Sequence, residues 1–199
     1  MTYRFADTDD LDQLVAMSDQ AKESFKARNI DQWQKGEPNR QVMEASILQS
    51  QLHVLEDMGQ VVGMITIVPG PEASYASIDG AWLNQEPYYA FHRVCVKDSL
   101  KGRGLAARLF SEAEQYVLQS GIRNIRIDTH PDNQAMQRAL AKSGYIRCGT
   151  LILTEGSEAG DLRVGYQKRI KGVQKGEGAS VRKRDGGGGG GGRLRSGNH

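Results

Sequence analysis

The sequence predicts an α/β (α+β) fold in which a mixed sheet is flanked by helices. Three observations support this prediction. Strand-like and helix-like segments follow one another in the order β, α, α, β, β, β, α, β, α, β, β. An amphipathic helix follows two closely spaced glycines near the middle of the chain. Finally, about 170 residues of ordinary composition suit one domain with a single sizeable core.

Capping and turn residues separate the elements of the first half. Residues 7–9 (Asp-Thr-Asp) offer N-cap oxygens to one helix, and Asn39 can cap a second. The turn 57–60 joins two strand-like runs, which predicts a hairpin. The predicted elements are a strand at 3–5, a helix with Leu11, Leu14, Val15 and Ser18 on one face, a loop at 28–38, a helix with Val42, Met43, Ile47 and Leu48, strands at 53–56 and 61–68, and an irregular segment at 71–87.

The second half begins with the strongest strand signal of the chain. Residues 88–96 (YYAFHRVCV) have high strand propensity. After the polar gap 97–101, Gly102 and Gly104 open a helix that Gly121 closes. The remaining predicted elements are the apolar face of that helix (Leu105, Leu109, Ala113, Tyr116 and Val117), a strand at 125–129, a helix at 134–143 stopped by Gly144, and an antiparallel pair at 145–153 and 161–169.

Charge and glycine are distributed unevenly along the chain. Of the 24 glycines, 11 lie in the last 28 residues, and seven of these run from Gly186 to Gly192. Residues 171–199 carry seven basic and two acidic side chains, or +5, so residues 1–170 carry 19 basic and 22 acidic ones, or −3. A tail of this composition cannot bury a core. We therefore expect one domain at 1–170 and a disordered, basic, Gly-rich tail at 171–199.

Several classes of protein do not fit this composition. Cys95 and Cys148 show no CxxC or Cys/His spacing, so neither a disulfide framework nor a zinc site is expected. The aliphatic run 61–68 is far shorter than the ~20 residues of a membrane helix. The acidic N-terminal segment also lacks the apolar core of a signal peptide. We expect a cytoplasmic protein with no membrane partner.

The segment VCVKDSLKGRGLAARLF (94–110) is the most informative for function, because a strand, a short loop and two glycines lead directly into a helix. Glycines allow the backbone to approach a ligand closely. The unpaired N–H groups and the dipole of a helix N-terminus favour phosphate oxygens. The pattern therefore predicts a pyrophosphate cradle made by the backbone of residues 103–106.

Two nucleotide-binding motifs compete for the same residues. A P-loop needs Lys and then Ser/Thr after its last glycine, where this chain has Leu105 and Ala106. A Rossmann fingerprint fits better, because Gly102, Gly104 and Ala107 match GxGxxA and Asp128 follows at the end of the next strand. Against it, five residues separate the strand from the first glycine, and several elements precede a motif that normally opens its domain.

The same residues resemble the pyrophosphate motif (Gln/Arg)-x-x-Gly-x-(Gly/Ala) of the GNAT superfamily of acyl-CoA N-acyltransferases. The segment Lys101-Gly-Arg-Gly-Leu-Ala106 matches it, with Lys in place of Gln/Arg. A second segment, from Asn133 to Gly144-Tyr145, is similar to the family's N-x-x-A-x-x-L-Y-x-K-x-G-F. The order of elements extends the resemblance over residues 1–170. It implies a mostly antiparallel sheet that splays at the cofactor strand and is flanked by about four helices.

The resemblance also implies where acetyl-CoA, the acyl donor, would bind. The pantetheine arm would pair with the backbone of Val94 and Val96, and backbone N–H groups near Val94 would stabilise the oxyanion. Asn133 would lie near the cofactor arm. The expected cofactor-binding residues are Val94, Val96, Lys101, Gly102, Arg103, Gly104, Leu105, Ala106 and Asn133.

Transfer by direct attack needs a base for the incoming ammonium and an acid for the leaving thiolate. His92 is the candidate base, because some family members carry a catalytic His on this strand; a packing role for His92 or a water chain as the base are the alternatives. Leu140 occupies the position where the family usually has a tyrosine that acts as the general acid, and leucine cannot donate a proton. Another tyrosine could substitute, or the thiolate could leave unassisted. The candidate tyrosines are Tyr88, Tyr89 and Tyr166.

Other chemistry-bearing residues are expected to be structural. The Asp-x-His-x-Asp array 128–132 is interrupted by a proline, so a loop-fixing role is favoured over a metal site, and no metal is expected. Cys95 lies between two valines and is expected to pack rather than to react. Tyr145 is expected in the core. Trp33 and Trp82 suit either the walls of an acceptor pocket or core packing.

These expectations combine into one functional hypothesis and its rivals. The chain is predicted to transfer an acetyl group from acetyl-CoA to a primary amine, the partner being a small-molecule or peptide amine. The acidic body weakly favours a cationic acceptor. A catalytically impaired acyl-CoA-binding or regulatory domain is the alternative, motivated by Leu140. Nucleic acid is expected only if the basic tail binds it, and a homodimer is an assembly that the sequence allows.

Overall fold

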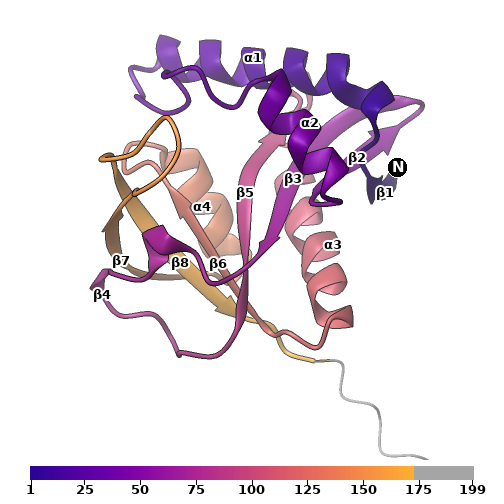
Figure 1. Ribbon diagram of the computed structural model, residues 1–199. Helices are drawn as coiled ribbons and strands as arrows, with labels where there is room; N and C mark the ends of the chain where they lie inside the picture. The colour runs from indigo at the N-terminus through magenta and orange to yellow at the C-terminus, as the bar shows by residue number, and fades with distance from the viewer. Residues whose placement is uncertain (173–199) are drawn as a thin grey trace, which may run out of the picture.

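The fold is an open sheet with helices on both faces, seen in a computed structural model that describes residues 1–172 (Figure 1). The predicted tail at 171–199 therefore lies almost entirely outside the described residues. The strands are β1 (Thr2–Phe5), β2 (Leu52–Asp57), β3 (Gln60–Pro69), β4 (Asp79–Gly80), β5 (Tyr88–Val96), β6 (Asn124–Thr129), β7 (Ile146–Ile152) and β8 (Leu162–Arg169). The α-helices are α1 (Leu11–Ala27), α2 (Arg40–Leu48), α3 (Leu105–Gln119) and α4 (Gln134–Lys142), with 3-10 turns η1 (Thr8–Asp10), η2 (Ala73–Tyr75) and η3 (Asp98–Leu100).

The described strands form one sheet in the order β1-β2-β3-β5-β6-β8-β7-β4. All pairs in it are antiparallel except β5 with β6. This confirms the predicted mixed, mostly antiparallel sheet with four flanking helices. It also rules out the Rossmann alternative, which requires a mostly parallel sheet.

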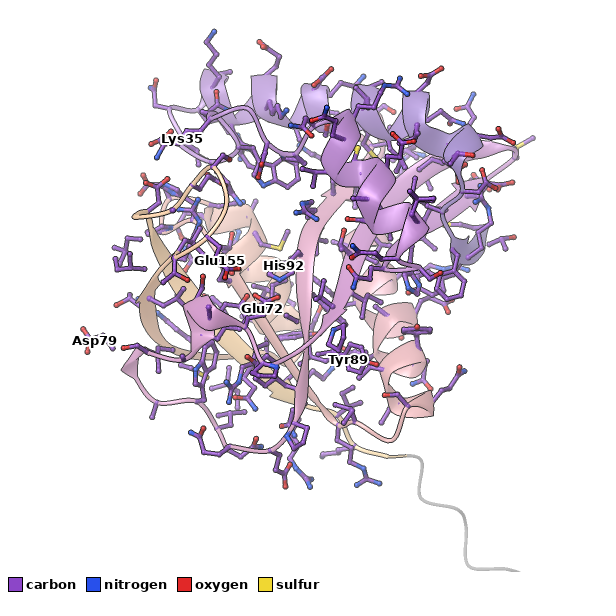
Figure 2. The ribbon with its side chains drawn as sticks, in the orientation of Figure 1. Lys35, Glu72, Asp79, Tyr89, His92 and Glu155 are labelled. Atoms are coloured by element: carbon purple, nitrogen blue, oxygen red, sulfur yellow. The ribbon has the colours of Figure 1, made fainter. Side chains whose placement is uncertain are left out.

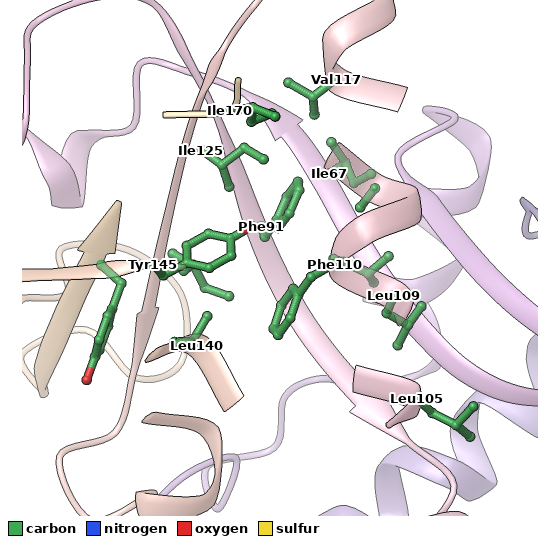
Figure 3. Close-up of a cluster of buried hydrophobic side chains, with 14 of the residues drawn as sticks. Ile67, Phe91, Leu105, Leu109, Phe110, Val117, Ile125, Leu140, Tyr145 and Ile170 are labelled. Carbon is green, nitrogen blue, oxygen red and sulfur yellow. The ribbon is translucent and has the colours of Figure 1, made fainter. Parts of the chain in front are cut away.

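Each face of the sheet has its own hydrophobic core. One core joins α3 and α4 to the strands, and Phe91, Phe110 and Leu140 are fully buried in it (Figure 3). The other joins α1 and α2 to β2, β3 and β5 and includes Met64 and Cys95. The sequence patterns that predicted the helices are therefore the apolar stripes that each helix turns toward the sheet.

Helix starts follow the predicted caps. The Asn39 side chain accepts a hydrogen bond from the backbone N–H of Val42, 2.9 Å away. Asp7 and Asp10 form a reciprocal capping box ahead of α1. None of the helices in residues 1–172 combines the length and apolar composition that a membrane span requires.

The segment 71–87, which we expected to be irregular, contains the short strand β4. This strand pairs with β7 through Gly80 and Gly149. A Cβ on Gly80 would lie 2.1 Å from the carbonyl oxygen of Cys148, so only glycine permits this backbone approach. A two-residue strand that depends on the absence of side chains gives no periodic signal in the sequence.

Candidate active site

The two central strands, β5 and β6, separate partway along their length. Their parallel pairing runs from Tyr88 and Asn124 to Phe91 and Ile127 and then ends. The remaining part of β5, residues 92–96, stays paired with β3, whereas the end of β6 stays paired with β8. The splay that the family resemblance implied is therefore present, and it opens the sheet at the predicted cofactor strand.

A bulge accompanies the separation. Thr66 lies opposite His92 and Met64 lies opposite Cys95, so two residues of β5, Arg93 and Val94, share one partner position on β3. Arg93 has a φ of 52°, in the left-handed region that few non-glycine residues adopt. The bulge redirects the side chains of β5 at the point where the sheet opens.

The bulged strand presents free backbone groups to the opening. The N–H of Lys97 donates to the carbonyl of Val62 at 2.8 Å, which makes Val96 and Gly63 a non-hydrogen-bonded pair. The N–H and C=O of Val96 therefore point away from β3, and the alternation of the strand extends this to Val94. Among the described residues, no strand pairs with this side of them.

The predicted cradle lies between β5 and α3. Gly102 and Gly104 have φ values of 81° and 75°, and an added Cβ at either would meet no protein atom within 4 Å. Gly104 is the N-cap of α3 and offers no side chain to its first turn. The first N–H groups of α3 thus lack intrahelical acceptors, as an anion site requires.

The side chains of the cradle have different surroundings. Leu105 is buried in the core at 8% exposure, so only its backbone can contact a ligand. Lys101 is exposed, and its Nζ lies 2.9 Å from Asp98 Oδ1, a contact that holds the cation beside the glycines. Arg103 is exposed and Ala106 partly buried. The cradle is therefore a backbone structure with one anchored cation.

A cavity of about 840 Å³ lies on the α1 and α2 side of the opening. It brings together residues far apart in the sequence, from β5, the end of β6, α2, and the loops 32–38 and 153–158. Three predicted residues, His92, Val94 and Asn133, line it, whereas Val96 and residues 101–106 lie outside it. The cavity and the cradle are thus separate parts of the candidate site, and β5 connects them.

His92 is held by a residue that the sequence did not point to. Its Nε2 is hydrogen-bonded to Glu72, and both side chains line the cavity (Figure 2). The backbone N–H of Glu72 donates to the hydroxyl of Tyr88 at 2.8 Å. The ring of Tyr75 stacks against His92 with centroids 6.4 Å apart. His92 is therefore partly exposed to the cavity, and Glu72 and Tyr75 hold its ring in place.

A second polar group lies beside this pair. The Tyr75 hydroxyl donates to Asp128 Oδ2 at 2.6 Å. Burial raises the pKa of the Asp128 carboxyl, although the charges of His92 and Arg163 and the Tyr75 hydrogen bond oppose the rise. Arg163 is bound to Glu158 Oε2 at 2.6 Å, with its Nε 3.9 Å from Asp128. These contacts link Tyr75, Asp128, Arg163 and Glu158 into one polar network beside His92.

Asn133 combines two roles in this part of the fold. Its Oδ1 accepts from the N–H of Met136 at 3.1 Å, which caps α4, and its Nδ2 donates to Gln32 Oε1 at 2.9 Å. It is 5% exposed and lines the cavity. The amide thus links α4 to the loop that follows α1.

The structure also places the candidates for the general acid. Leu140 and Tyr145 are buried in the core, and the Tyr145 hydroxyl donates to Glu114 at 3.0 Å, which confirms the packing role expected for Tyr145. Tyr88 and Tyr166 are buried, and Tyr166 donates to Gln137. Neither these two nor Tyr89 lines the cavity.

Cys95 and His130, which were expected to be structural, are held by burial and by a loop hydrogen bond, respectively. Cys95 is buried, and burial raises the pKa of its thiol to about 12, so it remains protonated. His130 Nδ1 accepts from the N–H of Asp132 at 3.0 Å and fixes the loop. Within residues 1–172, no group of three or more His, Cys, Asp and Glu side chains is placed to hold a metal ion. Trp33 lines the cavity, whereas Trp82 is buried beneath Arg126.

Sequence reasoning missed Glu72 and Arg93. Glu72 lies in a segment that we expected to be irregular, and it contacts His92, which is distant in the sequence and is brought close only by the fold. Arg93 follows His92 directly and would be expected on the opposite face of a regular strand. The bulge turns the Arg93 side chain toward the same cavity as His92, and no residue pattern in the sequence predicts this bulge.

Comparisons with known proteins agree with this geometry. Residues 16–145 match the model of the acetyltransferase (GNAT) family. A GNAT-family acetyltransferase from Streptococcus agalactiae is 30% identical, with a TM-score of 0.75 over 86% of this chain and 96% of that one. A putative acetyltransferase from Staphylococcus aureus is 26% identical, with a TM-score of 0.65 over 86% of this chain and 100% of that one. The search among curated proteins finds no match.

More distant structures share the fold alone. A ribosomal-protein-alanine N-acetyltransferase from Brucella melitensis is 21% identical, with a TM-score of 0.62 over 85% of this chain and 100% of that one. The family match spans both motifs from which the resemblance was drawn and well over half of the chain, and these comparisons do not favour the non-catalytic alternative. The chain belongs to the GNAT family of acetyltransferases and is an acyltransferase enzyme.

Proposed function

We propose that this enzyme transfers an acetyl group from acetyl-CoA to a primary amine of a small molecule or peptide, by direct attack, with His92 as the general base. The observation that carries the proposal is the position of His92. It lies on the cavity wall where β5 and β6 separate, two residues from the open backbone of Val94, and it is bound to Glu72.

The residues of the cradle and of β5 fit the donor. The pyrophosphate would bind at the first turn of α3, where Gly102 and Gly104 leave space and backbone N–H groups are free. Lys101 supplies a cation beside it. The pantetheine arm would follow the open edge of Val94 and Val96, with Asn133 near the arm. Acetyl-CoA, when bound, supplies the acetyl group as a thioester.

The contact with Glu72 supports Nδ1 of His92 as the nitrogen that acts as the base. An ionised carboxylate only accepts hydrogen bonds, so Nε2 carries the proton in the pair with Glu72. Nδ1 then keeps its lone pair and takes a proton from the incoming ammonium. The imidazolium that forms is stabilised by the adjacent carboxylate. Glu72 is thus a positioning residue for His92.

We propose that the CoA thiolate leaves without a protein acid. Leu140 is buried and has no proton to give, and the three tyrosines considered as substitutes do not line the cavity. A thiol with a pKa of about 8.5 is a fairly good leaving group, so a donor is not required. Water can later protonate the thiolate.

The test is an amine panel with acetyl-CoA in which released CoA is measured. Acetylation of at least one amine above the rate of thioester hydrolysis supports the proposal. Tight binding of acetyl-CoA without turnover on any amine would contradict it and would favour a binding domain. The panel should include polyamines, aminoglycosides, amino acids and peptides, because it then reports the acceptor class as well.

The other expectations remain proposals. In the described part of the chain Cys95 and Cys148 are free thiols, which supports a reducing compartment such as the cytoplasm. A role for the basic tail in nucleic-acid binding would fall outside the described residues. Retention on nucleic acid at low salt, compared between the full chain and one lacking residues 171–199, tests that role.

A further inference from the structure

Two consecutive side chains of β5 point to the same face of the sheet. Phe91 packs in the core on the α3 side, and His92 faces the opposite side with Thr66, its partner on β3. A regular strand would return the next side chain to the α3 side. The bulge instead turns Arg93 toward α2, where its Nη1 lies 3.4 Å from Ser46 Oγ. His92 and Arg93 thus line one cavity together.

The guanidinium of Arg93 has few partners. It has five N–H donors, and the long contact with Ser46 is its one hydrogen bond within residues 1–172. No carboxylate of that part of the chain lies within 4.0 Å of it. Burial lowers the pKa of Arg93, and Glu37 and Glu72 oppose this only through their charges. Arg93 therefore faces the cavity with most of its hydrogen-bonding capacity unused.

Arg163 lines the same cavity and has the contacts of an arginine with a structural role. Its side chain is 3% exposed, its Nη2 is bound to Glu158 at 2.6 Å, and its Nε lies 3.9 Å from Asp128. A partly buried arginine with unused donors is, by contrast, suited to bind an oxyanion through paired N–H groups. The ligand of Arg93 is not the cofactor phosphate, because the cradle at residues 101–106 lies outside this cavity.

We propose that Arg93 binds a carboxylate of the acceptor, and that the acceptor is a free amino acid rather than a polyamine. This inference rests on the proposed function, because it assigns the acceptor of the same site. His92 and Arg93 are neighbours in the chain and share a face, and Glu72 both binds His92 and acts on the charge of Arg93. The amine and the carboxylate are therefore bound close together, as an amino acid presents them.

The test compares amino acids with their decarboxylated amines, in pairs such as lysine and cadaverine, histidine and histamine, or phenylalanine and phenethylamine. For the preferred pair, the wild-type kcat/KM is expected to be at least about 10-fold higher for the amino acid than for its decarboxylated amine. This ratio corresponds to the free energy of one charge-assisted hydrogen bond. Arg93→Met should lower this ratio by about 10- to 100-fold, and Arg93→Lys should recover part of it. Arg138→Met, an exposed arginine on α4, serves as the control and should keep the wild-type ratio.

Two outcomes would overturn the inference: a wild-type preference for the decarboxylated amines, or an equal loss for both members of a pair in Arg93→Met. The second would indicate a role in the oxyanion site or in the fold. Calorimetric titration of CoA-saturated enzyme with the amino acids separates this inference from the proposed function. Binding that is lost in Arg93→Met supports the carboxylate site even if no amine is acetylated, and absence of binding to the wild type contradicts it.

Discussion

His92 and Glu72, twenty residues apart, are joined by a hydrogen bond at Nε2. Glu72 lies in the connection between β3 and β5, and its own N–H is held by the Tyr88 hydroxyl at 2.8 Å. Strand β5 thus supplies both the imidazole and, through Tyr88, the anchor of the residue that orients it. The candidate base is fixed by the same strand that carries the open backbone of Val94 and Val96.

Replacing His92 by alanine should abolish most of the activity. Loss of a general base is expected to lower kcat by about 100-fold or more. The affinity for acetyl-CoA should change little, because the cradle lies outside the cavity that His92 lines. Steady-state kinetics with the best amine and calorimetric titration with CoA measure the two effects. An unchanged kcat and pH–rate profile would show that a water chain, not His92, takes the proton.

Glu72→Gln tests whether the carboxylate orients and stabilises the base. The amide keeps the size of the side chain but can present its NH2 group to Nε2, which favours the wrong tautomer of His92. We expect kcat to fall by about 10-fold or more while KM for acetyl-CoA stays the same. Glu155→Gln removes the same charge from the same cavity without a contact to His92 and is the matched control. If Glu72→Gln and Glu155→Gln lower kcat equally, Glu72 acts only through its charge and does not orient His92.

Most elements, the short strand β4 excepted, were predictable because their signals are local. Caps such as Asn39, the stripes of α3, and the glycines at 102 and 104 each report on a few neighbouring residues. The candidate site was predicted only through the family resemblance, at the two motifs and on the strand that carries His92 and Val94. The bulge at Arg93 depends on register between β3 and β5, and the partner of His92 depends on where a loop folds back. Such long-range geometry leaves no periodicity in the sequence.

Gly104→Ala should weaken acetyl-CoA binding beyond its effect on stability. The residue has a φ of 75°, and its Cβ would project into the space where the pyrophosphate is expected. Gly121, just beyond the other end of α3, has a φ of 83° and equally open surroundings, so Gly121→Ala imposes the same backbone strain without touching the cradle. Both variants should lose about 1 kcal/mol of stability. Only Gly104→Ala should raise the Kd for acetyl-CoA, by about 10-fold, and equal Kd values would refute the cradle.

His53 is expected to make the fold sensitive to acid. Its side chain is 1% exposed, its Nε2 has no hydrogen-bond partner within residues 1–172, and the rings of Phe5 and Tyr116 lie 4.5 and 4.6 Å away. Burial lowers the pKa of His53 from 6.5 to about 4. Between these two values the unfolded chain binds a proton that the folded chain does not, so stability falls as the pH drops through this window.

His53→Phe removes this proton and keeps an aromatic ring in the pocket. Between pH 7 and pH 4.5 the wild type should therefore lose about 2 kcal/mol more unfolding free energy than the variant, since each pKa unit corresponds to about 1.4 kcal/mol. Urea unfolding of both proteins at the two pH values measures the difference. If both lose the same free energy, His53 is protonated in the folded state, and the ring cluster of Phe5 and Tyr116 must accommodate the charge through cation–π contact.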